Sequence, residues 1–85
     1  MKTSVEIGYY PLNDNYLTHI KDFIKRLNTH ENLIVKTNGM STQVFGEYDE
    51  VMSAITLEIK KSFELPHSVF MLKVINNDLD KIPSL

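Results

Sequence analysis

The side chains best placed to do chemistry surround a sharp turn near the middle of the chain. Residues 36–42 read Lys-Thr-Asn-Gly-Met-Ser-Thr, and the Asn38-Gly39 pair predicts a tight turn because both residues tolerate positive φ. The turn has more hydrogen-bonding side chains than its geometry needs, namely Thr37, Asn38, Ser41 and Thr42. Spacing alone favours a hairpin whose side chains bond its own backbone. The alternative is that these hydroxyl and amide groups hold a ligand.

Glu6 is a second candidate for binding, because its neighbours indicate a strand with one covered face. Apolar and polar residues alternate here: Val5, Ile7 and Tyr9 face one side, and Ser4, Glu6, Gly8 and Tyr10 face the other. If the second side is also covered, the Glu6 carboxylate needs a partner. Lys73, on a neighbouring predicted strand, could form a cross-strand ion pair with Glu6. Otherwise Glu6 could accept hydrogen bonds from a ligand amino group or offset a ligand cation.

The sequence predicts no catalytic or metal-binding arrangement. The histidines, His19, His30 and His67, lack metal-ligand spacing, and we expect them to be ordinary surface side chains. Without cysteine, disulfides and thiolate metal sites are excluded, and no Ser-His-Asp or Cys-His arrangement can be argued. With a net charge of −2 and scattered basic residues, the sequence does not predict a positively charged surface that would bind nucleic acid. We therefore expect no enzyme, no cofactor, no metal site and no nucleic-acid partner.

Hydrophobic periodicity indicates the elements that would position these residues. Beyond the first strand, the predicted elements are a helix capped by Asn13 or Asp14, strands at Leu33–Asn38 and Ser41–Tyr48, a helix capped by Asp49, and an apolar strand at Val69–Ile75. This β-α-β-β-α-β order is that of the ferredoxin-like plait, an α+β fold in which two helices cover one face of a four-stranded antiparallel sheet. We expect one domain, residues 1–76, followed by a polar C-terminal tail, residues 77–85, that frays.

The face of the sheet away from the helices would decide how the protein associates. If Phe70, Leu72 and Val74 point to the helices, the last strand turns Val69, Met71, Lys73 and Ile75 to the open face. Such a face is too apolar to remain in contact with water. The sequence therefore predicts sheet-to-sheet packing in an oligomer.

This sequence lacks the residues that other activities of this fold require. An RNA-recognition module needs aromatic motifs on its central strands, which residues 42–48 lack, and a soft-metal chaperone needs a cysteine pair. An acylphosphatase-like enzyme needs an arginine in the loop after the first strand, and residues 10–13 contain none.

No apolar segment approaches the length of a membrane span, and Glu6 interrupts the region where a signal peptide would be apolar. We expect a cytoplasmic protein without membrane insertion.

Several runs of this sequence resemble the YkoF-like thiamine/hydroxymethylpyrimidine-binding proteins. These runs are Ser4–Leu12 with Asn13-Asp14 opening a helix, Lys36–Thr42, and Gly46–Val51. The resemblance implies a ferredoxin-like fold and non-catalytic binding of thiamine or its hydroxymethylpyrimidine precursor, with a link to uptake or salvage of thiamine precursors. Some members carry two such units in tandem, whereas this chain has one. The resemblance therefore also implies a homodimer or dimer of dimers through the open sheet face.

The same resemblance implies a set of ligand contacts. Hydroxyl and amide groups would come from Thr37, Asn38, Ser41 and Thr42, with Ser4 and Glu6 on the adjacent first strand and Phe45 or Tyr10 stacking on a flat ring. Met71 and Ile75 depart from the tandem members, which are more polar at these positions, and Phe45 stands where relatives often have a charge. The alternative function is a ligand-sensing or purely structural module that regulates a protein partner through its oligomer surface.

Overall fold

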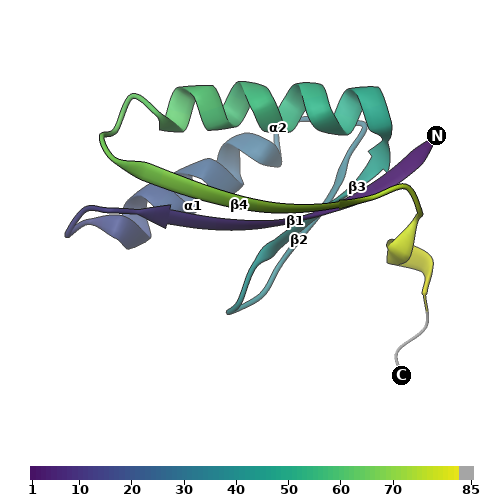
Figure 1. Cartoon of the computed structure of the whole chain (residues 1–85), viewed down its shortest axis with the longest axis horizontal. Helices are drawn as coiled ribbons and strands as arrows, with labels where there is room; N and C mark the ends of the chain where they lie inside the picture. The colour runs from purple at the N-terminus through teal and green to yellow at the C-terminus, as the bar shows by residue number, and fades with distance from the viewer. Residues whose placement is uncertain (83–85) are drawn as a thin grey trace.

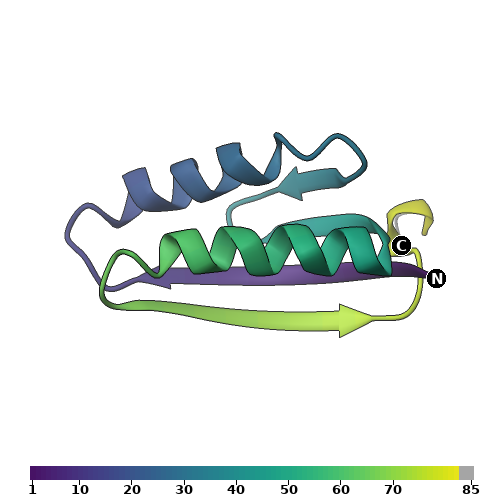
Figure 2. The ribbon, with the colours of Figure 1, turned by 90° about the horizontal axis from the view of Figure 1, so that it is seen from above.

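The computed structural model describes residues 1–82 and has the predicted element order. The elements are β1 (Lys2–Pro11), α1 (Tyr16–Leu27), β2 (Ile34–Thr37), β3 (Thr42–Glu47), α2 (Tyr48–Ser62), β4 (Ser68–Ile75) and a short 3₁₀ helix η1 (Leu79–Lys81). The strands form one four-stranded sheet in the order β2-β3-β1-β4, with every neighbouring pair antiparallel. Both helices lie on one face of this sheet (Figures 1 and 2). The predicted ferredoxin-like α+β fold is confirmed.

The strand register places the apolar side of β1 beneath the helices. Val5 lies opposite Val44 of β3 and Val74 of β4, and Ile7 lies opposite Leu72. The buried core gathers residues from β1, β3 and both helices, namely Val5, Ile7, Phe23, Leu27, Val44, Val51 and Ile55. The prediction of which side chains of β1 and β4 point to the helices is therefore confirmed.

Neither helix begins at its predicted cap: α1 begins later in the chain, and α2 begins earlier. The α1 helix starts at Tyr16 with Asn15 as its N-cap, because the Asn13 side chain instead accepts a 2.8 Å hydrogen bond from the Asn15 backbone N–H in the preceding turn. The α2 helix follows β3 directly, with Glu47 as its N-cap. Asp49 therefore lies inside the first turn, where its charge still complements the helix dipole.

The two helices are joined by a buried carboxylate. Glu58 of α2 accepts a 2.9 Å hydrogen bond from Arg26 Nε and lies 2.8 Å from His30 Nε2. Arg26 also donates to the Ser62 hydroxyl at 2.6 Å. The expectation that His30 is an ordinary surface residue is wrong, because its ring is held by the α2 carboxylate.

The C-terminal segment packs on the sheet instead of fraying. The Ser4 hydroxyl donates to the Asn77 carbonyl at 2.7 Å and accepts from the Leu79 backbone N–H at 2.9 Å. Asp80 forms an ion pair with Lys36 of β2. These contacts place η1 on the side of the sheet away from the helices (Figure 1). Residues 83–85 of the predicted tail lie outside the described residues.

Candidate functional site

Glu6 occupies the middle of the open sheet face. It lies in register with Gln43 of β3 on one side and with Lys73 of β4 on the other. The Ser41 hydroxyl donates to Glu6 Oε2 at 3.0 Å, and Lys73 Nζ lies 3.3 Å from Glu6 Oε1. The cross-strand ion pair with Lys73 is therefore present, and a residue of the predicted polar turn completes the arrangement.

These contacts keep Glu6 charged while leaving it accessible. The hydrogen bond from Ser41, together with the hydrogen bond and positive charge of Lys73, lowers the pKa of Glu6 below its ordinary value. The Glu6 side chain is still 42% exposed. A carboxylate has room for about four hydrogen bonds, so Glu6 can accept further donors from a bound molecule.

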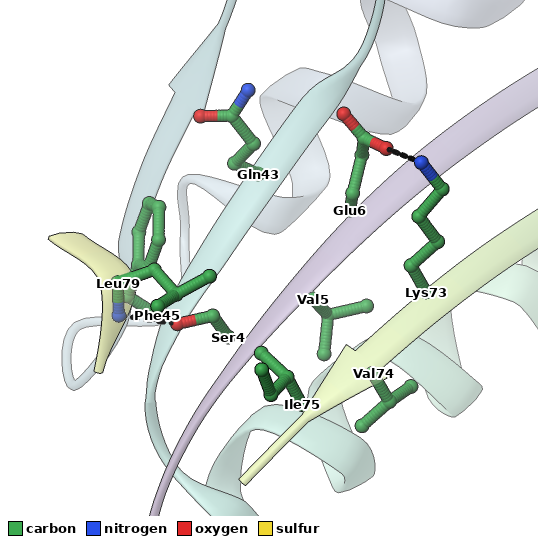
Figure 3. Close-up of a pocket in the computed structure, with 9 residues that line it drawn as sticks. All are labelled: Ser4, Val5, Glu6, Gln43, Phe45, Lys73, Val74, Ile75 and Leu79. Atoms are coloured by element: carbon green, nitrogen blue, oxygen red, sulfur yellow. Dashed lines mark hydrogen bonds and ion pairs between the residues drawn. The ribbon is translucent and has the colours of Figure 1, made fainter. Parts of the chain in front are cut away.

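Glu6 borders two hollows on this face. The first, about 420 Å³, lies between the sheet and the C-terminal segment (Figure 3). Its lining combines Glu6, Gln43 and Lys73 with apolar groups; the full lining is Ser4, Val5, Glu6, Gln43, Phe45, Lys73, Val74, Ile75 and Leu79. We call it the tail hollow. An apolar enclosure with a few convergent polar groups is typical of small-molecule sites.

The second hollow, about 380 Å³, lies toward the β2–β3 turn, and we call it the turn hollow. Its lining is Glu6, Gly8, Tyr10, Met40, Ser41, Met71, Leu72 and Lys73. Glu6 and Lys73 line both hollows, so the ion pair stands between them. The two hollows therefore lie on either side of the ion pair and make up a strip along the open face, with polar groups at its centre and apolar groups beyond them.

Five of the predicted ligand residues line at least one of these hollows, namely Ser4, Glu6, Tyr10, Ser41 and Phe45. Phe45 is only 8% exposed, whereas the Tyr10 ring is half exposed. Tyr10 is therefore the better placed of the two aromatic residues to stack on a ligand ring. Ser4 also lines the tail hollow, but its hydroxyl is already bonded twice to the C-terminal segment.

Thr37 and Thr42 lie on the other face of the sheet from Glu6. Thr42 is opposite Ile7, which belongs to the core, and its hydroxyl is 3.2 Å from that of Thr37. Both threonines border a smaller hollow of about 120 Å³ beside α1. Asn38 serves the turn itself, since its side-chain oxygen accepts from the Met40 and Ser41 backbone N–H groups at 2.8 and 3.1 Å.

Several residues outside the predicted site line the two hollows, and Gln43 and Leu79 bear most directly on the site. Gln43 lies directly opposite Glu6, and Leu79 closes the tail hollow from the C-terminal segment (Figure 3). Strict alternation along β3 could have identified Gln43, because it shares a face with Phe45. Nothing in the local sequence pattern of the tail identified Leu79.

Loss of the Asp80–Lys36 ion pair is expected to increase the opening of the C-terminal segment measurably. We expect Asp80→Ala to speed hydrogen exchange of the Leu79 amide by up to roughly fivefold, since an ion pair with one exposed and one partly buried partner contributes up to about 1 kcal/mol. Amide exchange followed by NMR measures this effect. Lys81→Ala, on the same segment, is the control and should leave exchange unchanged; equal exchange in both variants would contradict the assignment.

Residues 1–82 hold neither a metal-ligand cluster nor a membrane-spanning helix. Within this part of the chain, no three His, Asp or Glu side chains converge as metal ligands. No helix in the same range is long and apolar enough to cross a membrane.

Comparison with known proteins identifies the fold. No protein-family model matches the chain, and no curated protein matches it in sequence. A Streptococcus pneumoniae protein of solved structure has a TM-score of 0.85 at 21% identity, over 96% of this chain and 93% of its own. A hypothetical protein from Methanocaldococcus jannascii has a TM-score of 0.78 at 24% identity, over 91% of this chain and 81% of its own.

A third similar structure has the same fold. It is a Thermotoga maritima protein proposed to act in thiamine biosynthesis or salvage, with a TM-score of 0.80 at 18% identity over 91% of this chain and 85% of its own. Likeness at these identities shows the shared fold, and a shared fold does not carry a shared function. The function therefore depends on the residues of the open face.

Proposed function

We propose that this protein binds thiamine or its hydroxymethylpyrimidine precursor on the open sheet face without catalysing a reaction. The observation on which this rests most directly is the Glu6 carboxylate, held charged by Ser41 and Lys73 between two partly apolar hollows. The fold shared with the Thermotoga maritima protein proposed to act in thiamine biosynthesis or salvage supports the same ligand class.

The chemistry of an aminopyrimidine suits this site. Its exocyclic amino group donates hydrogen bonds, for which Glu6 and the Gln43 side-chain oxygen are suitable acceptors. Its flat ring can lie against Tyr10 or Ile75, and a thiazolium cation would gain attraction from the Tyr10 ring. Lys73 faces the same strip, so a phosphorylated form has one nearby cation available.

The proposal of binding without catalysis follows from the groups at the open face. They comprise one ionised carboxylate, an amide, hydroxyls and a lysine, with no histidine lining either hollow. A general base needs a pKa close to the working pH, whereas the contacts of Glu6 lower its pKa. These groups are suited to hold a ligand.

Isothermal titration with thiamine, hydroxymethylpyrimidine and thiamine diphosphate tests the proposal. We expect saturable binding near one ligand per chain for at least one of the three. If folded, ligand-free protein gives no binding heat with any of them, the thiamine assignment is wrong, and a structural or partner-regulating module becomes the better account.

Replacing Glu6 tests the site. We expect Glu6→Gln to weaken binding by roughly 10- to 100-fold, because the hydrogen bond from the ligand would then end on a neutral amide and no longer on a charged carboxylate. Glu31 lies in an exposed loop, distant from Glu6 in the sequence. Glu31→Gln removes the same charge and should bind the ligand as tightly as the native protein does. Titration of both variants measures the difference, and equal affinities would place the ligand elsewhere.

A further inference from the structure

A row of polar side chains crosses the open sheet face at the level of Glu6. The strand register places Gln43 of β3 between Glu6 of β1 and Lys36 of β2. On its other side, Glu6 lies opposite Lys73 of β4. Toward the C-terminal segment, the next residues of β3 and β4 on this face are apolar, namely Phe45 and Ile75. A molecule on this face therefore meets most of its polar contacts along one line, beside apolar surface.

The Gln43 side chain differs from the rest of this row in its bonding. Within residues 1–82, Lys36 pairs with Asp80 and Glu6 pairs with Lys73, whereas the Gln43 side chain forms no hydrogen bond. Gln43 is nevertheless half-buried and lines the tail hollow. Polar groups withdrawn from solvent normally find a partner, and an amide can both donate and accept. The Gln43 amide is therefore available to water or to a bound molecule.

The charge of Glu6 favours one orientation of the Gln43 amide. Residues directly opposite each other in an antiparallel pair have Cα atoms about 4.5–5.5 Å apart, so the two side chains stand side by side. Figure 3 shows the amide nitrogen of Gln43 on the side of Glu6 and the amide oxygen turned away. A negative carboxylate favours this orientation, because side-chain amide dipoles align with the local field. The open face thus presents an acceptor, Glu6, next to a donor, Gln43.

We propose that Gln43 determines which heterocycles bind, by donating a hydrogen bond to a ring nitrogen while Glu6 accepts one from the adjacent exocyclic amino group. This inference rests on the proposed function, and it assigns the nitrogen of the Gln43 amide, in preference to its oxygen, as the ligand contact. In an aminopyrimidine, the amino group and the neighbouring ring nitrogen offer a donor beside an acceptor. That pair is the complement of Glu6 and Gln43.

The two contacts together select ligands in which a ring nitrogen adjoins an amino-bearing carbon. An aromatic amine without a ring acceptor satisfies Glu6 but covers the Gln43 nitrogen without bonding it, which lowers affinity. Lys73 does not substitute for Gln43, because it lies on the other side of Glu6 and is paired with that carboxylate. Selectivity for the ring nitrogen therefore depends on Gln43.

Isothermal titration of native protein and Gln43→Met with two ligands tests this role. The ligands are hydroxymethylpyrimidine and its aniline analogue, which keeps the amino group and the flat ring but has C–H groups in place of both ring nitrogens. We expect the native protein to prefer the pyrimidine by roughly three- to tenfold, the contribution of one neutral hydrogen bond. Gln43→Met should lose this preference, because a methionine side chain is flexible enough to fill the same space but has no N–H to donate.

Asn32→Met is the matched control, because Asn32 also carries an amide but lines a different hollow, beside Glu50 of α2. This variant should keep the native preference. Equal affinity of the native protein for both ligands, a preference that survives in Gln43→Met, or one lost equally in Asn32→Met overturns the assignment of Gln43. A native protein that binds neither ligand instead removes the proposed function together with this inference, so the two failures are distinguishable.

Discussion

Replacing Phe23 with alanine is expected to lower the free energy of unfolding by about 3–5 kcal/mol. Phe23 is 1% exposed and lies where α1 meets the sheet. Its ring centroid is 5.3 Å from that of Tyr9 and 5.1 Å from that of Phe70. Removing the ring leaves a cavity and breaks both aromatic contacts. A domain of this size has only about 4–13 kcal/mol of stability in total, so the variant should be partly unfolded at modest temperature.

Urea unfolding followed by circular dichroism measures this loss. Leu17→Ala is the matched control, because Leu17 is on the same helix but half exposed, and such a surface change should stay within about 0.5 kcal/mol. All proteins must be compared at one concentration, since association would add to apparent stability. Equal unfolding midpoints for the two variants would show that α1 does not pack on the sheet through Phe23.

Glu58→Ala is expected to cost about 2–3 kcal/mol. The Glu58 side chain is 3% exposed, and its removal leaves Arg26 and His30 without their shared acceptor. Breaking a fully buried pair costs about 3–5 kcal/mol, and the partial exposure of Arg26 and His30 reduces that figure. Asp22→Ala removes the exposed partner of Arg26 and should cost less than about 1 kcal/mol. Thermal and urea unfolding compare the two variants, and equal losses would contradict a buried role for Glu58.

The same carboxylate makes stability depend on pH. Burial acts to raise the pKa of Glu58, but the hydrogen bonds from His30 and Arg26 outweigh it and hold that pKa below the ordinary value near 4.5. The stabilisation is therefore fully present above the unfolded-state pKa and is lost as the pH falls through the lower folded-state pKa. We expect the stability difference between native protein and Glu58→Gln to shrink in acid, and urea unfolding at a series of pH values measures it. A difference that grows in acid would reverse the assigned direction.

The fold was predictable because its evidence is local. Alternation in β1, the apolar run of β4 and the Asn38-Gly39 turn each depend on residues close together in the chain. The facing of β3 was less evident, because Thr42, Gln43, Val44 and Phe45 read as two polar residues followed by two apolar ones. The pairing of Val44 with Val5 across the two strands settles the facing of β3, with Gln43 on the open face and Thr42 on the core side.

The contacts that the sequence did not predict join residues far apart in the chain. Glu58 meets Arg26 and His30 from a different helix, 32 and 28 residues away. Ser4 holds the backbone of Leu79 from 75 residues away. No periodicity in either segment encodes such a pairing, since each depends on how the elements come together in space. For the same reason, the polar composition of the tail gave no sign that it docks.

The docked C-terminal segment makes the tail and any occupant of the tail hollow thermodynamically coupled. A molecule that touches Leu79 in the docked state loses that contact when the segment swings away, so it binds the docked form more tightly. Reciprocity then requires that the molecule strengthen docking by the same factor. The Leu79 amide, bonded to Ser4, would thus act as a built-in reporter of occupancy: its exchange slows when the hollow fills, and it speeds up when an occupant displaces the segment.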